Sequence, residues 1–386
     1  MKPFPAVMIG GPPHSGKSVL TYSLSQLLRQ RQIAHYVLRT CPDGEGDWAN
    51  ETDQHLVRQI RVKGKYTRRW IARICRDISK RHLPLIVDVG GKPKQWQEII
   101  FGHCTHAILL TPNPQARLVW EKLVEAHNVP VIAALHSTRD GQNRVEKTEP
   151  ILQGCISNLE RGLMAQGPVF NQLVDLLSAI LTYEAEELRR RHVTMAPTEL
   201  TVELRQVGAA LSWSNNYHRW LPGNLPSLLD YVPAQTPLGI YDRGPNWVYT
   251  ALALHAYPAA LFQFDVRLGW IAPPKVRLLP VVSDPTLRVR LMKRGTYAII
   301  DITIIKNYLD YEEAFNLTLP SVSPDQGIVI SGKLPLWLWT AIAVAYQSAP
   351  WVAVFQPQLG HRAIIIASKQ AGVQVGRLIE CKLDTV

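Results

Sequence analysis

Short apolar runs alternate with longer segments that carry apolar residues at helical spacing through the first half of the chain. The runs have the length of buried strands, and the segments between them can cross from one parallel strand to the next. This alternation predicts an α/β fold with a doubly wound parallel sheet. The predicted strands lie at residues 6–10, 33–39, 84–90, 106–111 and 129–134, and the predicted helices at 17–30, 66–81, 114–127 and 151–165.

The pattern changes after the charged helical segment that ends in EAEELRRRH. Charge density falls, Pro197 prevents the helix from continuing, and polar and apolar residues begin to alternate with a period of two. We therefore expect a domain boundary near residue 193 and assign residues 1–192 to the first domain.

The second half contains an internal repeat with a spacing of ninety residues. The segment WVYTALALHAYPAALFQFDVRLG from Trp247 aligns with WLWTAIAVAYQSAPWVAVFQPQLG from Trp337, with one residue inserted before the closing motif. The segments are apolar on most faces, so we expect their tryptophans in the core. Such a duplication predicts two tandem α+β units, at residues 197–285 and 294–386, that pack as a pseudo-dimer.

The octapeptide GPPHSGKS at residues 11–18 separates the first predicted strand from the first predicted helix. Strand, loop and helix form a complete Walker A pattern, in which glycines let the backbone wrap a phosphate chain and the helix N-terminus points N–H groups at it. Lys17 would reach the β/γ-phosphates and Ser18 would ligate Mg²⁺. We expect a P-loop domain that binds ATP through Gly11, His14, Ser15, Gly16, Lys17 and Ser18.

Further candidate groups of this domain follow the predicted strands. Asp88 ends the apolar run LPLIVDV, where a Walker B carboxylate would hold Mg²⁺ through water or act as a base, and capping of a turn is the alternative. The acidic loop RTCPDGEGDW could hold an acceptor, and the basic segment KGKYTRRW could close over phosphates, although both also suit a solvated turn. Thr138 and Asp140 are candidates for contacting the base. ATPase, kinase and nucleotide-sensing roles all remain open.

Charge and cysteine usage narrow the choice of partner. The net charge of +11 is uneven, because residues 1–192 hold 26 Lys and Arg against 18 Asp and Glu, whereas residues 193–386 hold 16 against 13. A net charge of +3 argues against non-specific binding of duplex DNA by the second half, but a small anion with few phosphates suits it. The five cysteines lack metal-ligand spacing, and no apolar run is long enough to span a membrane. We expect a cytoplasmic protein.

The turns that precede the two tryptophan segments are candidate phosphate sites. DRGPNW and SGKLPLW each combine glycine with a basic residue immediately before a predicted helix, and such a turn can offer N–H groups and charge to an anion. We expect Arg243 and Gly244 in the first turn, and Gly332 and Lys333 in the second, to contact a ligand.

The second copy also resembles a known family. LPSVSPDQGIVISGKLPLWLW, followed by a helix and FQPQLGHRAIIIAS, is similar to the CRISPR-associated ring nucleases of type III systems, the Csx/Crn group, which carry a G-x-x-P-x-W turn and then D-P-R-L-G. The resemblance covers about 95 residues of the second copy and, more weakly, about 85 of the first. It implies a homo-oligomer that uses Mn²⁺ to linearise cyclic tetra-adenylate and trims short RNA, with some members fused to a P-loop domain.

Carried over residue by residue, the resemblance places the reactive groups in the first copy. The family's acidic residue and arginine fall on Asp265 and Arg267, whereas the second copy has Gln356 and Gln358. A carboxylate can ligate Mn²⁺ and an arginine can stabilise charge on a phosphate, but glutamine replaces neither. The family's helix-end histidine is matched by His255, which could act as a general acid or base or bind backbone instead.

Three functions fit these observations. The first is a ring nuclease that uses Asp265, Arg267 and His255 and takes part in antiviral CRISPR defence. The second is a sensor that binds the cyclic messenger without cleaving it and gates ATP hydrolysis. The third is a small-molecule or RNA kinase with a structural tail. The expected cofactors are ATP, Mg²⁺ and Mn²⁺.

Overall fold

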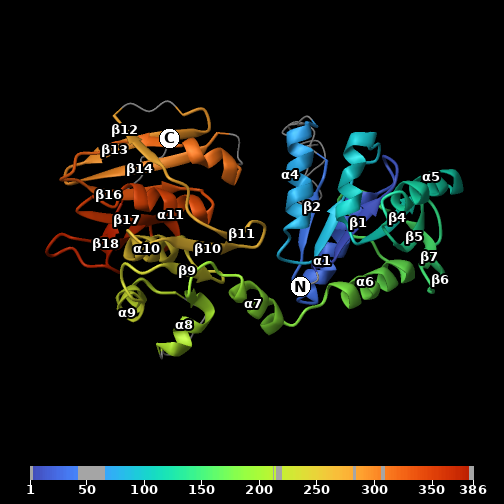
Figure 1. Ribbon diagram of the computed structural model, residues 1–386, viewed down its shortest axis with the longest axis horizontal. Helices are drawn as coiled ribbons and strands as arrows, with labels where there is room; N and C mark the ends of the chain where they lie inside the picture. Colours follow the sequence, from blue (N-terminus) through green and yellow to red (C-terminus); the bar gives the residue numbers. More distant parts are fainter. Residues whose placement is uncertain are drawn as a thin grey trace. The chain divides into compact units, whose positions relative to one another are not determined.

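The computed structural model describes residues 3–41, 66–211, 213, 220–280, 284–305 and 309–381. The chain forms two compact units, one of residues 1–192 together with 266–269 and one of residues 193–265 and 270–386 (Figure 1). We call them the N-terminal unit and the C-terminal unit and describe each by itself. Most of the acidic loop and the start of the basic segment lie outside the described residues. No described helix is long and apolar enough to cross a membrane.

The N-terminal unit is built on a seven-stranded sheet whose described strands follow the order β2-β3-β1-β4-β5-β7-β6. Every neighbouring pair is parallel except β6 and β7. From β1 the chain continues to β2 and β3 on one side of β1, and from β3 it crosses to β4 on the other side. This change of direction opens a crevice at the carboxyl ends of the strands. The strands are β1 (Ala6–Gly10), β2 (Tyr36–Arg39), β3 (Leu85–Asp88), β4 (His106–Thr111), β5 (Val131–Thr138), β6 (Arg144–Lys147) and β7 (Leu152–Ser157).

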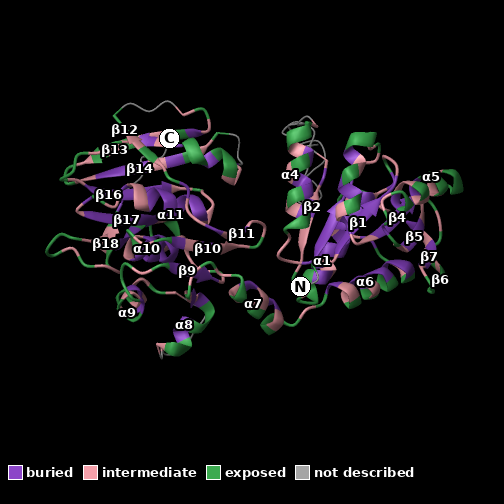
Figure 2. Cartoon of the chain, viewed as in Figure 1, coloured by how far each residue is buried: buried purple, intermediate pink, exposed green. Residues whose placement is uncertain are grey.

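Helices cover both faces of this sheet, and a separate apolar core lies under each layer (Figure 2). Leu20 and Leu24 of α1 pack with Phe170 and Leu173 of α6 in one core. Helices α4 and α5 and the 3₁₀ segment η1 contribute to the other. The predicted doubly wound arrangement of strands and helices is therefore observed. The bounds are α1 (Lys17–Gln30), α4 (Arg68–Ser79), η1 (Gln95–His103), α5 (Pro114–Glu125), α6 (Pro168–Leu181) and α7 (Ala185–Thr194).

The helix predicted at residues 151–165 is wrong, because this segment contains strand β7. β7 pairs with β5 on one side and with β6 on the other. At Gly154 a Cβ atom would lie 2.4 Å from the carbonyl oxygen of Arg144, so glycine allows β6 to approach. The apolar run ILQGCIS suited a helix as well as a strand, and pairing with β6 decides between them. The next helix, α6, begins only at Pro168.

The first half of the C-terminal unit has a four-stranded sheet in the order β11-β10-β9-β8. Strand β9 leads through a turn into α10, which returns the chain to the start of β10, and β9 and β10 are parallel. The bounds are β8 (Leu200–Glu203), α8 (Leu204–Ala210), η2 (Pro222–Asn224), α9 (Leu225–Tyr231), β9 (Leu238–Tyr241), α10 (Asn246–Ala256), β10 (Leu261–Asp265) and β11 (Gly269–Ile271).

The second half has a six-stranded sheet in the order β13-β14-β16-β17-β18-β19, and β12 and β15 form a separate parallel pair. Strand β16, helix α11 and strand β17 repeat the β9, α10 and β10 unit. The bounds are β12 (Arg277–Leu279), β13 (Leu287–Arg294), β14 (Tyr297–Ile304), η3 (Tyr311–Asn316), β15 (Thr318–Pro320), β16 (Gly327–Gly332), α11 (Leu336–Ala345), β17 (Trp351–Gln356), η4 (Pro357–Leu359), β18 (Arg362–Ser368) and β19 (Leu378–Glu380).

The two halves correspond residue by residue around their helices. Residues 241–250 and 331–340 have the same burial class at every position. The predicted buried tryptophans are confirmed, since Trp247 and Trp337 are 4% and 2% exposed. Helices α10 and α11 contact each other, so the two halves share a core.

Candidate functional site

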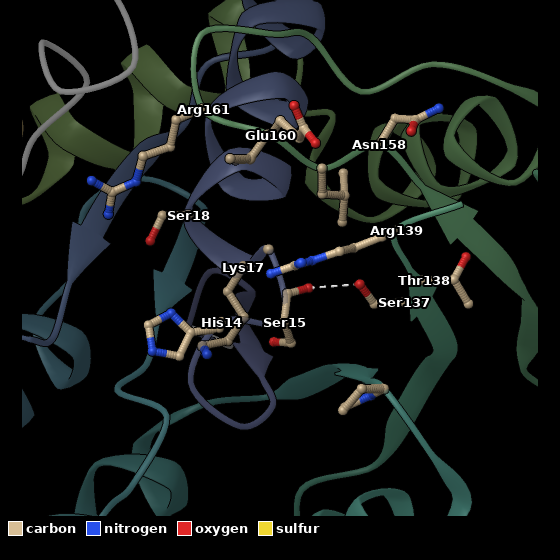
Figure 3. Close-up of a pocket in the computed structure, with 14 residues that line it drawn as sticks. His14, Ser15, Lys17, Ser18, Ser137, Thr138, Arg139, Asn158, Glu160 and Arg161 are labelled. Atoms are coloured by element: carbon tan, nitrogen blue, oxygen red, sulfur yellow. Dashed lines mark hydrogen bonds between the residues drawn. The ribbon is translucent and has the colours of Figure 1, made fainter. Parts of the chain in front are cut away.

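A cavity of ≈ 660 Å³ opens where β1, β5 and β7 end and α1 begins (Figure 3). It lies at the carboxyl ends of parallel strands, where α/β proteins hold their ligands. Figure 3 shows side chains from the Gly11–Ser18 loop, from the end of β5 and from the segment after β7 around it. The lining residues are His14, Ser15, Gly16, Lys17, Ser18, Val19, Pro112, Ser137, Thr138, Arg139, Asn158, Leu159, Glu160 and Arg161.

Two glycines shape the loop that borders this cavity. Gly11 has φ 151° and Gly16 has φ 89°, which are conformations that residues with a Cβ rarely adopt. A Cβ at Gly11 would lie 2.0 Å from the Leu110 carbonyl oxygen, and one at Gly16 would lie 2.6 Å from the Cβ of Leu159. Gly16 is also the N-cap of α1 and supplies no side-chain hydrogen bond to the helix. The first turn of α1 contains no acidic residue. The N–H groups and positive dipole end of α1 are therefore suited to an anion.

Lys17 is held in the loop and is only 8% exposed. Its Nζ donates a hydrogen bond to the carbonyl oxygen of Pro12 at 2.8 Å, and Ser15 Oγ donates to the same oxygen at 3.0 Å. Burial lowers the pKa of Lys17, while nearby Asp88 and Cys41 oppose that shift. A bound phosphate would stabilise the charged form of Lys17, which burial disfavours.

Asp88 receives two donors on the same carboxylate oxygen. Ser18 Oγ donates to Asp88 Oδ2 at 3.1 Å, and Arg39 Nη1 lies 3.3 Å from that oxygen. The sheet register brings them together, because Ile9 and Arg39 both pair with Asp88 across neighbouring strands. A hydroxyl and a carboxylate are hard oxygen donors that suit Mg²⁺. Ser18 and Asp88 are thus the residues that would hold Mg²⁺ beside a bound phosphate.

The structure adds residues to this site that the sequence did not indicate. Arg39 at the end of β2 was not predicted. A basic residue that ends a strand of a parallel sheet can indicate a ligand-binding site, so the sequence did contain a signal for it. Ser137 Oγ donates to the Ser15 carbonyl oxygen at 2.9 Å and supports the loop. The segment from Asn158 to Arg161 was hidden by the wrong helix prediction. Thr138 lines the cavity as expected, and its buried hydroxyl has no hydrogen-bond partner among the described residues.

The two turns of the C-terminal unit occupy equivalent places before α10 and α11. Arg243 and Lys333 are both exposed, and Gly244 and Gly332 are half-buried. Gly332, with φ 149°, brings the backbone close to Ile302, whose carbonyl oxygen would lie 2.4 Å from a Cβ at that position. Each turn thus presents one basic side chain to solvent beside the N-terminus of a helix.

A hydrogen bond joins the regions of the two turns. Gln356 Nε2 donates to Asn246 Oδ1 at 2.7 Å. Gln356 ends β17, next to the Gly332 end of the parallel neighbour β16, and Asn246 is the first residue of α10. Both turns therefore lie at the same end of the C-terminal unit.

The three predicted reactive residues of the first copy are not brought together. Asp265 ends β10 and Arg267 follows it, and both are half-buried. His255 lies in the last turn of α10, and its Nε2 is 2.7 Å from the Val232 carbonyl oxygen. The backbone N–H of Gln235, which precedes β9, donates to the His255 carbonyl oxygen at 2.9 Å, so the last turn of α10 lies near the beginning of β9, whereas Asp265 lies at the end of the parallel strand β10. The role predicted for His255 stays a prediction.

The metal predicted at Asp265 finds no ready set of ligands in the described part of the chain. No group of three or more His, Cys, Asp or Glu side chains there is arranged to hold a metal ion. Asp265 alone would supply a carboxylate from the predicted set, and three or more protein ligands are usual for a dedicated transition-metal site. Within the described residues, the side chains around Asp265 therefore do not by themselves build a Mn²⁺ site, and Mn²⁺ stays a prediction.

Comparison with known proteins places the end of the chain in a CRISPR context. Residues 302–380 match the family described as CRISPR-associated protein (Cas_csx3). This supports a CRISPR-associated protein with a role in CRISPR defence. A solved structure described as "Crystal structure of APE1195" is 21% identical over 35% of this chain and 61% of the other, with a TM-score of 0.16. The match spans less than two thirds of that chain, and so low a TM-score carries no argument about fold or function.

Proposed function

We propose that the C-terminal unit binds a cyclic oligoadenylate, with cyclic tetra-adenylate as the first candidate and short RNA as a related ligand. The match to a CRISPR-associated family supports a role in CRISPR defence. The observation that carries the proposal is the hydrogen bond between Gln356 and Asn246, which brings the regions of both turns to one end of the unit. Arg243 and Lys333 would then contact phosphates of a single ligand.

The two halves would act as a pseudo-dimer toward this ligand. A cyclic tetranucleotide has symmetry-related phosphates, and a receptor with two equivalent turns can match that symmetry within one chain. The equal burial of residues 241–250 and 331–340 supports this equivalence. Further assembly into a homo-oligomer stays a prediction.

Cleavage would fall to the first repeat and would switch off the messenger. A ribose 2′-hydroxyl would attack the adjacent phosphorus as the P–O5′ bond breaks; Asp265 would accept the proton of the attacking hydroxyl, and the departing 5′-oxygen would take a proton from water. Arg267 would stabilise the negative charge that develops on the phosphate. Gln356 and Gln358 in the second repeat offer neither group. This step is written without His255, which lies in the last turn of α10 and contacts the Val232 carbonyl oxygen, and the role predicted for it stays a prediction. The step is written without a metal, since the residues present do not build a Mn²⁺ site.

The test is product analysis with labelled cyclic tetra-adenylate, with and without Mn²⁺. We expect the wild type to yield linear products, and Asp265→Ala plus Arg267→Ala to bind the ring without opening it. Arg243→Ala plus Lys333→Ala should weaken binding by about a hundredfold or more, since each of the two phosphate contacts from a charged donor is worth roughly 1.5–3 kcal/mol. Full cleavage by the Asp265 and Arg267 variant would remove these residues from the mechanism.

A sensor is the alternative function of the same unit. The glutamines of the second repeat and the backbone bond of His255 favour it, because they reduce the number of reactive groups. Tight binding of cyclic tetra-adenylate with no turnover, in Mn²⁺ or without it, would select the sensor over the nuclease.

We further propose that the N-terminal unit is a P-loop domain that binds ATP with Mg²⁺. The cavity bordered by Gly16, Lys17 and Ser18 supports this, since helix dipole, ammonium and hard oxygen ligands converge there. The test measures ATP binding and hydrolysis by the wild type and by Lys17→Met. Transfer of labelled γ-phosphate to an added acceptor would identify a kinase, and hydrolysis that responds to cyclic tetra-adenylate would identify a gated ATPase. Absence of ATP binding by the wild type would refute the proposal.

A further inference from the structure

The first repeat differs from the second at positions that surround Asp265. The residues that correspond at a spacing of ninety are Asp242 and Gly332, and Tyr249 and Trp339. Asp242 adopts φ 78°, a left-handed conformation that glycine adopts most readily and that Asp tolerates better than most other residues. The second repeat has glycine at this place. The second repeat therefore has no counterpart of the Asp242 side chain, and any contact that this carboxylate makes belongs to the first repeat alone.

Tyr249 contacts the backbone of Asp242, and Arg205 contacts its carboxylate. The buried hydroxyl of Tyr249 donates a hydrogen bond to the Asp242 carbonyl oxygen, and Trp339 of the second repeat lacks such a hydroxyl. Burial raises the pKa of Tyr249, and the charges of Asp242 and Asp265 raise it further, so both carboxylates lie near this hydroxyl. The parallel register of β9 and β10 agrees, because Ile240 pairs with Gln263 and the next two residues of each strand lead to Asp242 and Asp265.

The Asp242 carboxylate contacts Arg205 at the start of α8. Oδ2 accepts a hydrogen bond from the Arg205 backbone N–H at 3.4 Å, and Oδ1 lies 3.8 Å from Nε of the same residue. The Asp242 side chain is 13% exposed, whereas that of Arg205 is 65% exposed. Asp242 thus sets the position of a guanidinium that remains accessible to solvent. The next residue of the turn, Arg243, is exposed as well.

We propose that Asp242 is a positioning residue that holds Arg205 beside Arg243, so that the two guanidinium groups clamp one phosphodiester of the ligand next to Asp265. The inference rests on the proposed function, because the clamp acts on the same oligoadenylate. Arginine suits this task, since its planar fork binds phosphate oxygens through two donors. The clamp explains why an acidic residue is retained in a turn that binds an anion.

Asp242→Gly separates this role from a purely structural one. Glycine accepts φ 78°, so we expect the melting temperature to stay within about 2 °C of the wild type or to rise. Affinity for cyclic tetra-adenylate should fall about tenfold, the effect of one lost contact from a charged donor. If the carboxylate merely repelled the ligand, its removal would tighten binding instead. Equal or tighter binding by Asp242→Gly would therefore overturn the inference.

A double-variant comparison tests whether Asp242 acts through Arg205. Arg205→Ala should weaken binding about tenfold, and Arg205→Ala plus Asp242→Gly should bind as Arg205→Ala alone. Arg288→Ala removes one charge from the exposed face of β13 and should leave affinity within about twofold of the wild type. Additive losses in the double variant would show that the two residues act independently and would contradict the proposal.

Paired tyrosine variants test the role of the Tyr249 hydroxyl. Tyr346 is the matched control, because it is also buried and its hydroxyl donates to the Pro320 carbonyl oxygen at 2.7 Å. Tyr249→Phe should lower affinity for cyclic tetra-adenylate several-fold, whereas Tyr346→Phe should lower only the melting temperature. Equal affinities in the two variants would contradict positioning by Tyr249. A wild type that binds no cyclic oligoadenylate would refute the proposed function itself, and with it the clamp.

Discussion

Thr340 on α11 donates a hydrogen bond to the side-chain oxygen of Gln263 on β10, with 2.9 Å between Oγ1 and Oε1. Both residues are buried, at 0% and 2% exposure, and they belong to different repeats. A buried polar pair favours one arrangement of the two halves, because a shift would take the Thr340 donor away from the Gln263 oxygen, whereas Thr340 could still bond to carbonyl oxygens of its own helix. The pair therefore contributes to the specificity of packing between the repeats.

Thr340→Val should destabilise the C-terminal unit by about 1–3 kcal/mol, because Gln263 would lose a partner in a site closed to water. The matched control is Thr250→Val at the corresponding position of α10. The Thr250 hydroxyl bonds only to carbonyl oxygens of its own helix, at Asn246 and Trp247, so its loss should cost less than about 1 kcal/mol. Urea unfolding measures both free energies. Equal losses in the two variants would show that the bond between the repeats adds nothing.

Much of the fold could be predicted from local pattern, and most of the cross-strand geometry could not. The bounds of α1 were predicted at both ends, because the glycine loop marks its start and apolar spacing marks its length. The repeat predicted equivalent helices, which the matching burial of residues 241–250 and 331–340 confirms. β7 was missed because a short apolar run has no periodicity of its own, and its pairing with β5 and β6 defines it.

The candidate sites show the same limit. Lys17 and Ser18 belong to one continuous motif, so sequence alone could group them. Arg39 reaches Asp88 only because β2 and β3 pair in register, and no local signal states that register. His255 and Asp265 were grouped by the family resemblance, and the course of the chain from α10 through β10 places them at opposite ends of this unit. Residues that meet through sheet order or helix direction require the structure.

Gly16→Ala should destabilise the N-terminal unit and abolish its nucleotide site. A Cβ at Gly16 would meet Leu159 at 2.6 Å, in addition to the strain of φ 89°. Gly162→Ala is the control, since Gly162 has φ 86° but open space around its Cβ position. We expect about 1 kcal/mol of backbone strain in the control and roughly 1–3 kcal/mol more in Gly16→Ala, where overpacking adds to it. Thermal unfolding of both variants checks the difference, and a similar loss in each would exclude the clash.

Lys17→Met should stabilise the nucleotide-free protein near neutral pH while weakening ATP binding by about 10- to 100-fold. Burial lowers the pKa of Lys17 below its ordinary 10.5, so a charged Lys17 costs folding free energy. That cost is complete below the folded-state pKa and fades as pH rises from it toward 10.5, because the folded protein then releases the proton first. The advantage of methionine should therefore shrink at alkaline pH.

Melting temperatures of Lys17→Met and wild type across this pH range, without nucleotide, test the sign. Lys147→Met, on the exposed face of β6, controls for the loss of one positive charge. A stability difference that grows with pH, or one that Lys147→Met reproduces, would contradict burial as the cause.

Asp88→Asn should uncouple ATP binding from Mg²⁺. Asparagine keeps the shape of the side chain and can still accept a hydrogen bond from Ser18, but it lacks the charge that attracts the cation. Without Mg²⁺, the affinity for ATP should equal or exceed that of the wild type, since a carboxylate no longer repels the phosphates. With Mg²⁺, it should fall by about tenfold or more.

Arg39, whose side chain is 14% exposed, would lose its ion pair with Asp88, so we also expect a stability loss of about 3 kcal/mol. Calorimetric titration with and without Mg²⁺ measures the coupling, and Glu125→Gln, at the exposed end of α5, supplies the control. Retention of the wild-type response to Mg²⁺ by Asp88→Asn would remove Asp88 from the metal site.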